Sequence, residues 1–147
     1  MNEKNDPHYA RKIIATIVDY TIVFLSMYFW IKEFGEPNSE GGYTASGIYA
    51  LPPIVFWIIL LPMSESLFSA TLGHWMVGLR IVDESGFTPD FFMALKRRIA
   101  DIIDLPFFAI PAFIAIERTP MGQRLGDLWA RTVVIDREVK KNMNNSG

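Results

Sequence analysis

Four carboxylates lie inside apolar stretches of this chain, and no lysine or arginine lies in those stretches with them. They are Asp19, Glu65, Asp101 and Asp104. Because a charge in hydrocarbon is costly, an acidic residue within a membrane segment indicates a functional site. The charge of these four groups must be balanced by protons, by bound cations, or by arginines that reach in from the ends of the stretches.

The apolar residues gather in three blocks, 13–31, 48–72 and 99–116, instead of being spread along the chain. A helix rises ~1.5 Å per residue, so each block is close to the length that crosses a hydrocarbon core of ~30 Å. The sequence therefore predicts an all-α polytopic membrane protein with about three apolar helical segments. We expect one domain over residues 1–147, with a core at about 10–136 and a flexible tail at 137–147.

Prolines interrupt two of these blocks. Pro62 predicts a kink in the second block. Pro106 and Pro111 stand in the third block together with its two aspartates, and they favour a broken, re-entrant segment over one that spans once. Both topologies remain open at this point.

The segment between the second and third blocks is amphipathic. Gly73 and Gly78 bracket four residues and indicate turns where the chain leaves the membrane. Strands are predicted at 78–83 and 131–136, and they can form a small two-stranded cytoplasmic element if both lie on one side. A helix is expected to start near Asp90 and to end with the basic residues that precede the third block.

The positions of the 14 basic residues predict the orientation. Three lie in 1–12, one in 32–47, four in 73–98 and six in 117–147. This bias places the N-terminus in the cytoplasm and the 32–47 loop outside. The formal net charge of −2 gives no reason to expect nucleic acid as a partner, and without cysteine no Cys-based metal site can form. We expect no cofactor.

Each intramembrane carboxylate has a structural and a functional interpretation. Asp101 and Asp104 share a helix face near Arg97 and Arg98, so they form either an ion-binding cluster or ion pairs at a helix end. Glu65 is either an ion site or an interfacial anchor, and the acid in the first block is either an ion site or a helix-packing group. No nucleophile, phosphate loop or metal-ligand spacing accompanies them, so we do not expect an enzyme.

Several strings, in their order and spacing, resemble the RDD family of bacterial membrane proteins. They are Arg11 with Asp19, the string TLGHWMVGLRIVD at 71–83, the string QRLGD at 123–127 and the string ARTVV at 130–134, with Glu65, Arg98, Asp104 and Pro106 between them. The arginine and two aspartates that name the family look like Arg11, Asp19 and Asp127. His74 stands where the family pattern usually has lysine, which would make its contact pH-dependent. Taken alone, this isolated histidine is interpreted as an interface residue.

The resemblance implies transport, because the family is suspected of transport and sodium/proton antiport has been proposed for some members. Asp19, Glu65, Asp101 and Asp104 would then bind protons or monovalent cations, with Arg11, Asp127 and Arg98 as a charge network. Three apolar segments are too few for a pathway, so transport implies a homo-oligomer in the bacterial inner membrane, surrounded by lipid. The alternative is a non-transporting membrane scaffold or accessory subunit.

Overall fold

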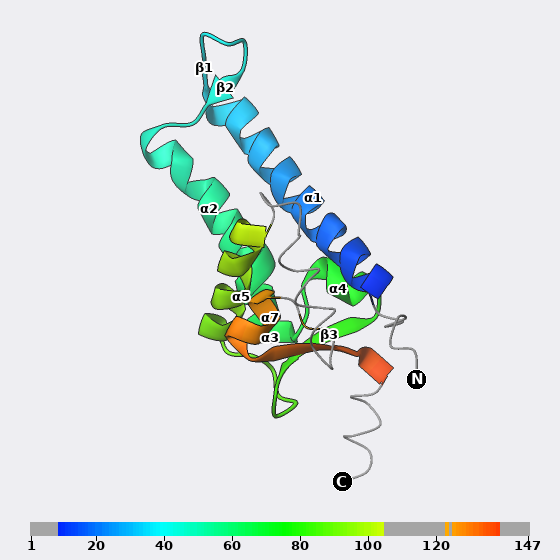
Figure 1. Ribbon diagram of the computed structural model, residues 1–147. Coiled ribbons are helices and arrows are strands. Elements are labelled where there is room, and N and C mark those ends of the chain that lie inside the picture. The colour runs from blue at the N-terminus through cyan, green and yellow to red at the C-terminus, as the bar shows by residue number, and fades with distance from the viewer. Residues whose placement is uncertain (1–8, 105–122, 124, 139–147) are drawn as a thin grey trace.

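The computed structural model describes residues 9–104, 123 and 125–138, and the architecture below concerns these residues. Two long helical stretches form a hairpin that stands on a base of shorter helices and one small sheet (Figure 1). In chain order the elements are α1 (Tyr9–Phe34), β1 (Glu36–Pro37), β2 (Tyr43–Thr44), η1 (Gly47–Ala50), α2 (Leu51–Ile58), η2 (Ile59–Met63), α3 (Ser64–Phe68), α4 (Leu72–Met76), β3 (Leu79–Asp83), α5 (Phe91–Asp104), α7 (Leu125–Ala130) and β4 (Thr132–Asp136).

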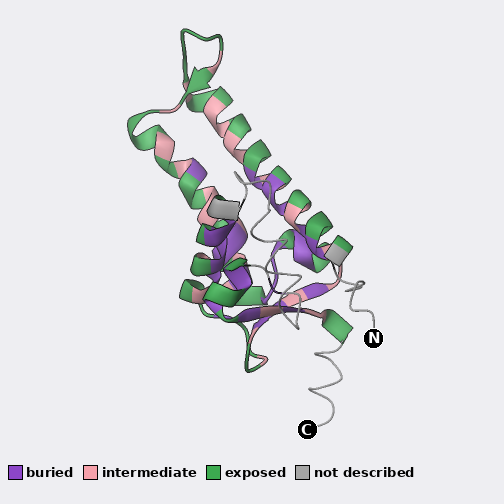
Figure 2. Cartoon of the chain, in the orientation of Figure 1, coloured by how far each residue is buried: buried purple, intermediate pink, exposed green. Residues whose placement is uncertain are grey.

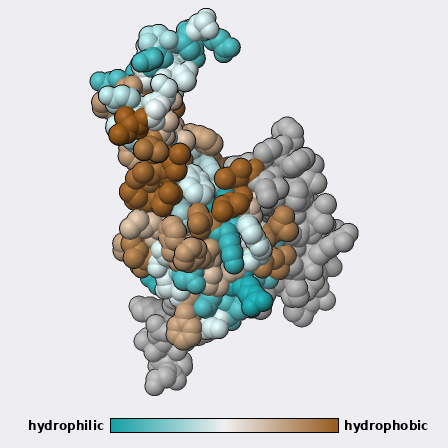
Figure 3. Space-filling model, turned by 90° about the vertical axis from the view of Figure 1, so that its left-hand side faces the viewer, coloured by the Kyte–Doolittle hydropathy of each residue, from teal (hydrophilic) through white to brown (hydrophobic). Residues whose placement is uncertain are grey.

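The hairpin contains two stretches that are long and apolar enough to cross a membrane, Ala10–Phe34 and Gly47–Phe68. Only 22% and 17% of their apolar windows are buried, unlike the core helices of a soluble protein. Hydrophobic side chains form a band below a hydrophilic tip (Figure 3). The first two apolar blocks are therefore helical as predicted. Of the third block only residues up to Asp104 are described, so its topology lies outside the described residues.

The second apolar block is not one continuous helix. Pro62 lies in η2, which is π-helical, so the helix is irregular at the position where a kink was predicted. The helix then ends at Phe68, because Ser69 adopts a left-handed conformation with φ of 56°. The residues from Leu72 onward, where turns were expected, form the separate short helix α4.

The helix expected near Asp90 begins at Phe91, and the Asp90 carboxylate accepts the backbone N–H of Met93 at 2.8 Å. The helix was predicted to end with the basic residues, but it continues to Asp104. The reason is that no residue between Arg98 and Asp104 breaks a helix. The basic residues therefore lie inside α5, and the first acids of the third block lie on the same helix.

The two predicted strands pair. β3 and β4 are antiparallel, and their register runs from Leu79 opposite Asp136 to Asp83 opposite Thr132. Leu79, together with Ile81 and Val134, forms a small buried apolar cluster on one face. A second two-stranded sheet, β1 with β2, closes the tip of the hairpin, where only a polar loop was expected.

Burial is concentrated in the base and in the part of α1 that faces it (Figure 2). Tyr20 and Val23 of α1 pack with Leu61 of η2 in an apolar cluster. On the other side, α4 lies so close to α1 that a Cβ added to Gly73 would overlap the carbonyl oxygen of Ala15. Only glycine permits this approach, which brings the backbone of α4 to the middle of α1.

Candidate functional site: buried charges where the hairpin meets the base

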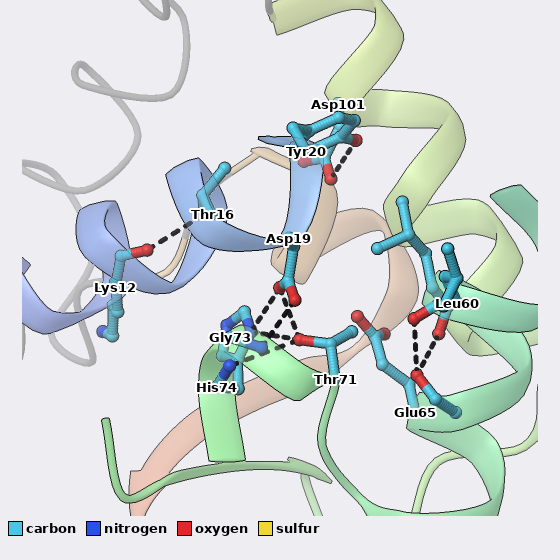
Figure 4. Close-up of polar contacts among 12 residues, drawn as sticks. Lys12, Thr16, Asp19, Tyr20, Leu60, Glu65, Thr71, Gly73, His74 and Asp101 are labelled. Carbon is cyan, nitrogen blue, oxygen red and sulfur yellow. Dashed lines mark hydrogen bonds and ion pairs between the residues drawn. The ribbon is translucent and has the colours of Figure 1, made fainter. Parts of the chain in front are cut away.

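Asp19 of α1 is 3% exposed and receives its hydrogen bonds from the start of α4. The backbone N–H of Gly73 donates to Oδ1 at 2.7 Å, and the Thr71 hydroxyl donates to Oδ2 at 2.5 Å. Nδ1 of His74 lies 3.2 Å from Oδ2. Figure 4 shows these three groups converging on the carboxylate. Asp19 therefore fastens α4 to the membrane helix.

The local sequence explains why α4 presents these donors. Thr71 is extended, with φ of −82° and ψ of 172°, and its hydroxyl also accepts the N–H of His74 at 3.4 Å. This is an N-cap, in which a threonine oxygen satisfies a free N–H of the first helical turn. The N–H of the preceding residue, Gly73, is directed to Asp19 instead. The string Thr-Leu-Gly-His thus builds a carboxylate-binding turn.

His74 is 1% exposed, so its side chain faces the interior of the site, although the sequence alone indicated an interface residue. Burial lowers the pKa of its imidazole to about 4, and the positive charges of Arg97 and Arg98 also lower it, while the bond to Asp19 opposes the shift. The imidazole is therefore neutral at pH 7, and its Nδ1 donates to the Thr71 hydroxyl oxygen at 2.7 Å and, more weakly, to Oδ2 of Asp19 at 3.2 Å. A neutral histidine does not cancel the charge of Asp19.

A second group of charges surrounds Arg98, which is 2% exposed on α5. Its guanidinium pairs with Glu65 of α3 and lies 3.0 Å from Oδ2 of Asp101. The Tyr20 hydroxyl donates to the same Asp101 oxygen at 3.0 Å. Burial alone would lower the pKa of Arg98, but the two carboxylates outweigh burial and raise it. The expected pair between Arg98 and Asp101 is confirmed.

The neighbouring Arg97 connects this group to α7. Its Nε lies 2.7 Å from Oδ1 of Asp127, and its Nη1 lies 3.8 Å from Oε2 of Glu65. A Cβ added to Gly126 would lie 2.8 Å from the carbonyl oxygen of Arg97, so α7 packs closely against α5. Adjacent arginines therefore hold different elements, because their side chains leave the helix in different directions.

Arg11 lies at the other end of α4. Its Nε and Nη2 donate to the carbonyl oxygen of Val77 at 2.9 and 2.6 Å, which caps the end of that helix. Its Nη1 pairs with Asp136 of β4 at 2.8 Å. Of the expected charge network, Asp127 and Arg98 meet in one cluster through Arg97 and Glu65, and Arg11 binds the strand end.

The four carboxylates of the apolar blocks have different surroundings in the structure. Glu65 and Asp101 are neutralised by Arg98 of α5. Of the three ways to balance their charge, namely protons, bound cations or arginines, these two acids use an arginine. Asp19 forms its own cluster with α4, and the side chain of Asp104 lies outside the described residues. Within the described ranges no three histidine or acidic side chains gather to hold a metal ion.

The sequence did not indicate a role in the site for Thr71 or Asp136, and it indicated an interface residue at His74. A signal for Thr71 and His74 was present, because a threonine three residues before the histidine has N-cap spacing. No local signal marks Asp136, which contacts a residue 125 positions away.

Comparison with protein families adds a finding that the geometry cannot supply. Residues 7–131 match the RDD family, a family of membrane proteins. A search of curated proteins and a search of solved structures gave no match. The matched range contains Arg11, Asp19 and Asp127 and both buried clusters. By this match over most of its length, and in agreement with its two apolar helices, the chain belongs to the RDD family.

Proposed function

We propose that this protein transports protons or monovalent cations across the bacterial inner membrane as a homo-oligomer, with Asp19 as the exchanging carboxylate. One observation supports the proposal most strongly. Asp19 is buried, and among the described residues no lysine or arginine forms an ion pair with it. The titratable side chain that contacts Asp19 is the imidazole of His74, which is neutral at pH 7. A buried carboxylate without a cationic partner attracts a cation, and the three donors around Asp19 hold the carboxylate in its charged form.

Glu65 and Asp101 are weaker candidates for ion binding than the sequence indicated. Both contact the guanidinium of Arg98, and an arginine in a protein does not give up its proton. A mobile cation would therefore have to displace a fixed one. We propose that this arginine and its two acids hold the helices together and that exchange is centred on Asp19.

The proposed orientation has the N-terminus and the base on the cytoplasmic side. It follows from the basic residues outside the membrane segments. Large apolar side chains on the hairpin are exposed, among them Phe24 at 60% and Phe29 at 63%, and they suit contact with lipid and with neighbouring copies. A pathway built by several copies would pass along these helices.

The second candidate is a non-transporting scaffold or accessory subunit. It is favoured by the fact that three arginines each join two different elements. Arg98 joins α5 to α3, Arg97 joins α5 to α7, and Arg11 joins α1 to β4. In this case Asp19 is a packing group that fastens α4.

Transport in proteoliposomes separates the two candidates. The Asp19→Asn variant retains a hydrogen-bond acceptor for Gly73 but cannot exchange a proton or hold a cation by charge. We expect Na⁺, Li⁺ or K⁺ to move protons through the wild type and not through this variant, at equal oligomer size. The matched control, Glu84→Gln, removes an exposed acid in the turn after β3 and should behave as the wild type. A wild type that responds to none of the three cations would favour the scaffold.

A further inference from the structure

The part of the hairpin that stands free of the base is short for a membrane. α4 runs beside the first half of α1, with Gly73 against Asp19 and with the Val77 carbonyl on Arg11. From Tyr20 to the end of α1 at Phe34 there remain about 15 residues, or ~22 Å of helix. A hydrocarbon core is ~30 Å thick, and about 20 helical residues cross it.

A bilayer that is filled by α1 must therefore extend to about Ala15. The second spanning stretch gives the same boundary, because its 22 residues, Gly47–Phe68, measure ~33 Å and are needed almost in full. α4 starts four residues after Phe68 and contacts α1 at Ala15 and Asp19. The membrane boundary on this side thus falls at the level of α4.

The surface of α4 fits such a position. Its inward side chains are those of the buried site, whereas Leu72, Trp75 and Met76 are 51%, 56% and 62% exposed. The guanidinium of Arg137 lies 5.8 Å from the centroid of the Trp75 ring. A tryptophan with a cation above it and apolar neighbours is typical of the interface between acyl chains and headgroups.

We infer that α4 is an interfacial helix, embedded in the leaflet on the side of the α1 N-terminus, with lipid acyl chains on Leu72, Trp75 and Met76. Arg137 then lies at the level of the lipid phosphates. The chain does not leave the membrane at Gly73, as its glycines suggested, but lies along the boundary for one more helical turn. The inference rests on the membrane placement of the hairpin and not on transport.

Site-directed spin labelling tests this position directly, because the chain contains no cysteine. A nitroxide at Met76→Cys in phosphatidylethanolamine/phosphatidylglycerol vesicles is compared with one at Ser85→Cys, in the exposed turn after β3, and one at Phe24→Cys, on the exposed face of α1. We expect position 76 to collide with oxygen several-fold more than with a water-soluble nickel complex. Position 85 should show the reverse, and position 24 should show the strongest preference for oxygen.

Two outcomes overturn the inference. Nickel accessibility at position 76 equal to that at position 85 would place α4 in water. Low accessibility to both reagents would mean that protein, such as a neighbouring copy, covers the helix. If Met76→Cys does not fold, Leu72→Cys on the same face is measured in its place, with the same criteria. The measurement needs no transport activity, so its failure is distinguishable from failure of the proposed function.

Discussion

Replacing Arg98 by methionine tests how the buried charges stabilise the fold. The substitution keeps most of the side-chain length and removes the guanidinium that contacts Glu65 and Asp101, which are 0% and 9% exposed. Removing one partner of a buried ion pair costs roughly 3–5 kcal/mol, because the remaining charge stays buried without compensation. The Tyr20 hydroxyl still donates to Asp101, so we expect a loss near the lower end, about 3 kcal/mol.

The assay is equilibrium unfolding in mixed micelles, followed by far-ultraviolet circular dichroism. Lys96→Met, an exposed cation on the same helix, is the control and should change the free energy of unfolding by less than about 0.5 kcal/mol. The double variant Glu65→Leu with Arg98→Met removes both charges together and should recover part of the loss, because an apolar pair needs no compensation. An Arg98→Met variant as stable as the control, or a double variant whose loss equals or exceeds the sum of the two single losses, would show that the guanidinium does not stabilise the fold by pairing with these carboxylates.

Three further predictions concern α4. The folded state lowers the pKa of His74 to about 4, so its contribution to stability is full above pH ~6.5 and is lost as the pH falls towards about 4, by at most roughly 3 kcal/mol. In His74→Asn, which keeps a side-chain N–H donor, the midpoint of thermal unfolding should fall less steeply with decreasing pH over this range. A midpoint that falls as steeply as in the wild type would contradict the assignment. Gly73→Ala should lower stability by about 1–3 kcal/mol in the same assay, because its Cβ would overlap α1, whereas Gly42→Ala meets nothing nearer than 3.4 Å and should be close to wild type. Arg11→Met removes the cap at the end of α4 and the ion pair with Asp136, and it should cost about 1–2 kcal/mol of stability. Hydrogen exchange in α4 should become faster, and unchanged exchange there would exclude this role.

The sequence predicted those parts of the fold that depend on neighbouring residues. The two candidate spanning stretches follow from long apolar blocks, and the irregularity at Pro62 follows from its missing N–H. The break at Ser69 could not be predicted in this way. Its carbonyl accepts the N–H of Ile81 at 2.7 Å and its hydroxyl lies 2.6 Å from that of Thr88, so contacts with later parts of the chain hold it in a left-handed conformation.

The candidate site was predictable in its residue types but not in its pairing. A carboxylate in a membrane segment is visible in the sequence, and Asp101 lies one helical turn from its arginine. In contrast, Glu65 and Arg98 are 33 residues apart, and Asp19 and His74 are 55 residues apart. Only the tertiary packing decides which carboxylate receives an arginine and which receives a neutral histidine.

Proton flux through Asp19→Asn shows whether Asp19 exchanges protons and cations, as we propose. Wild-type protein and the variant are reconstituted at equal density and oligomer size, and internal pH is followed after a pulse of Na⁺, Li⁺ or K⁺. We expect a cation-dependent pH change in the wild type that is lost in the variant and kept in Glu84→Gln. A pH change of equal size and rate in Asp19→Asn would rule out Asp19 as the exchanging carboxylate.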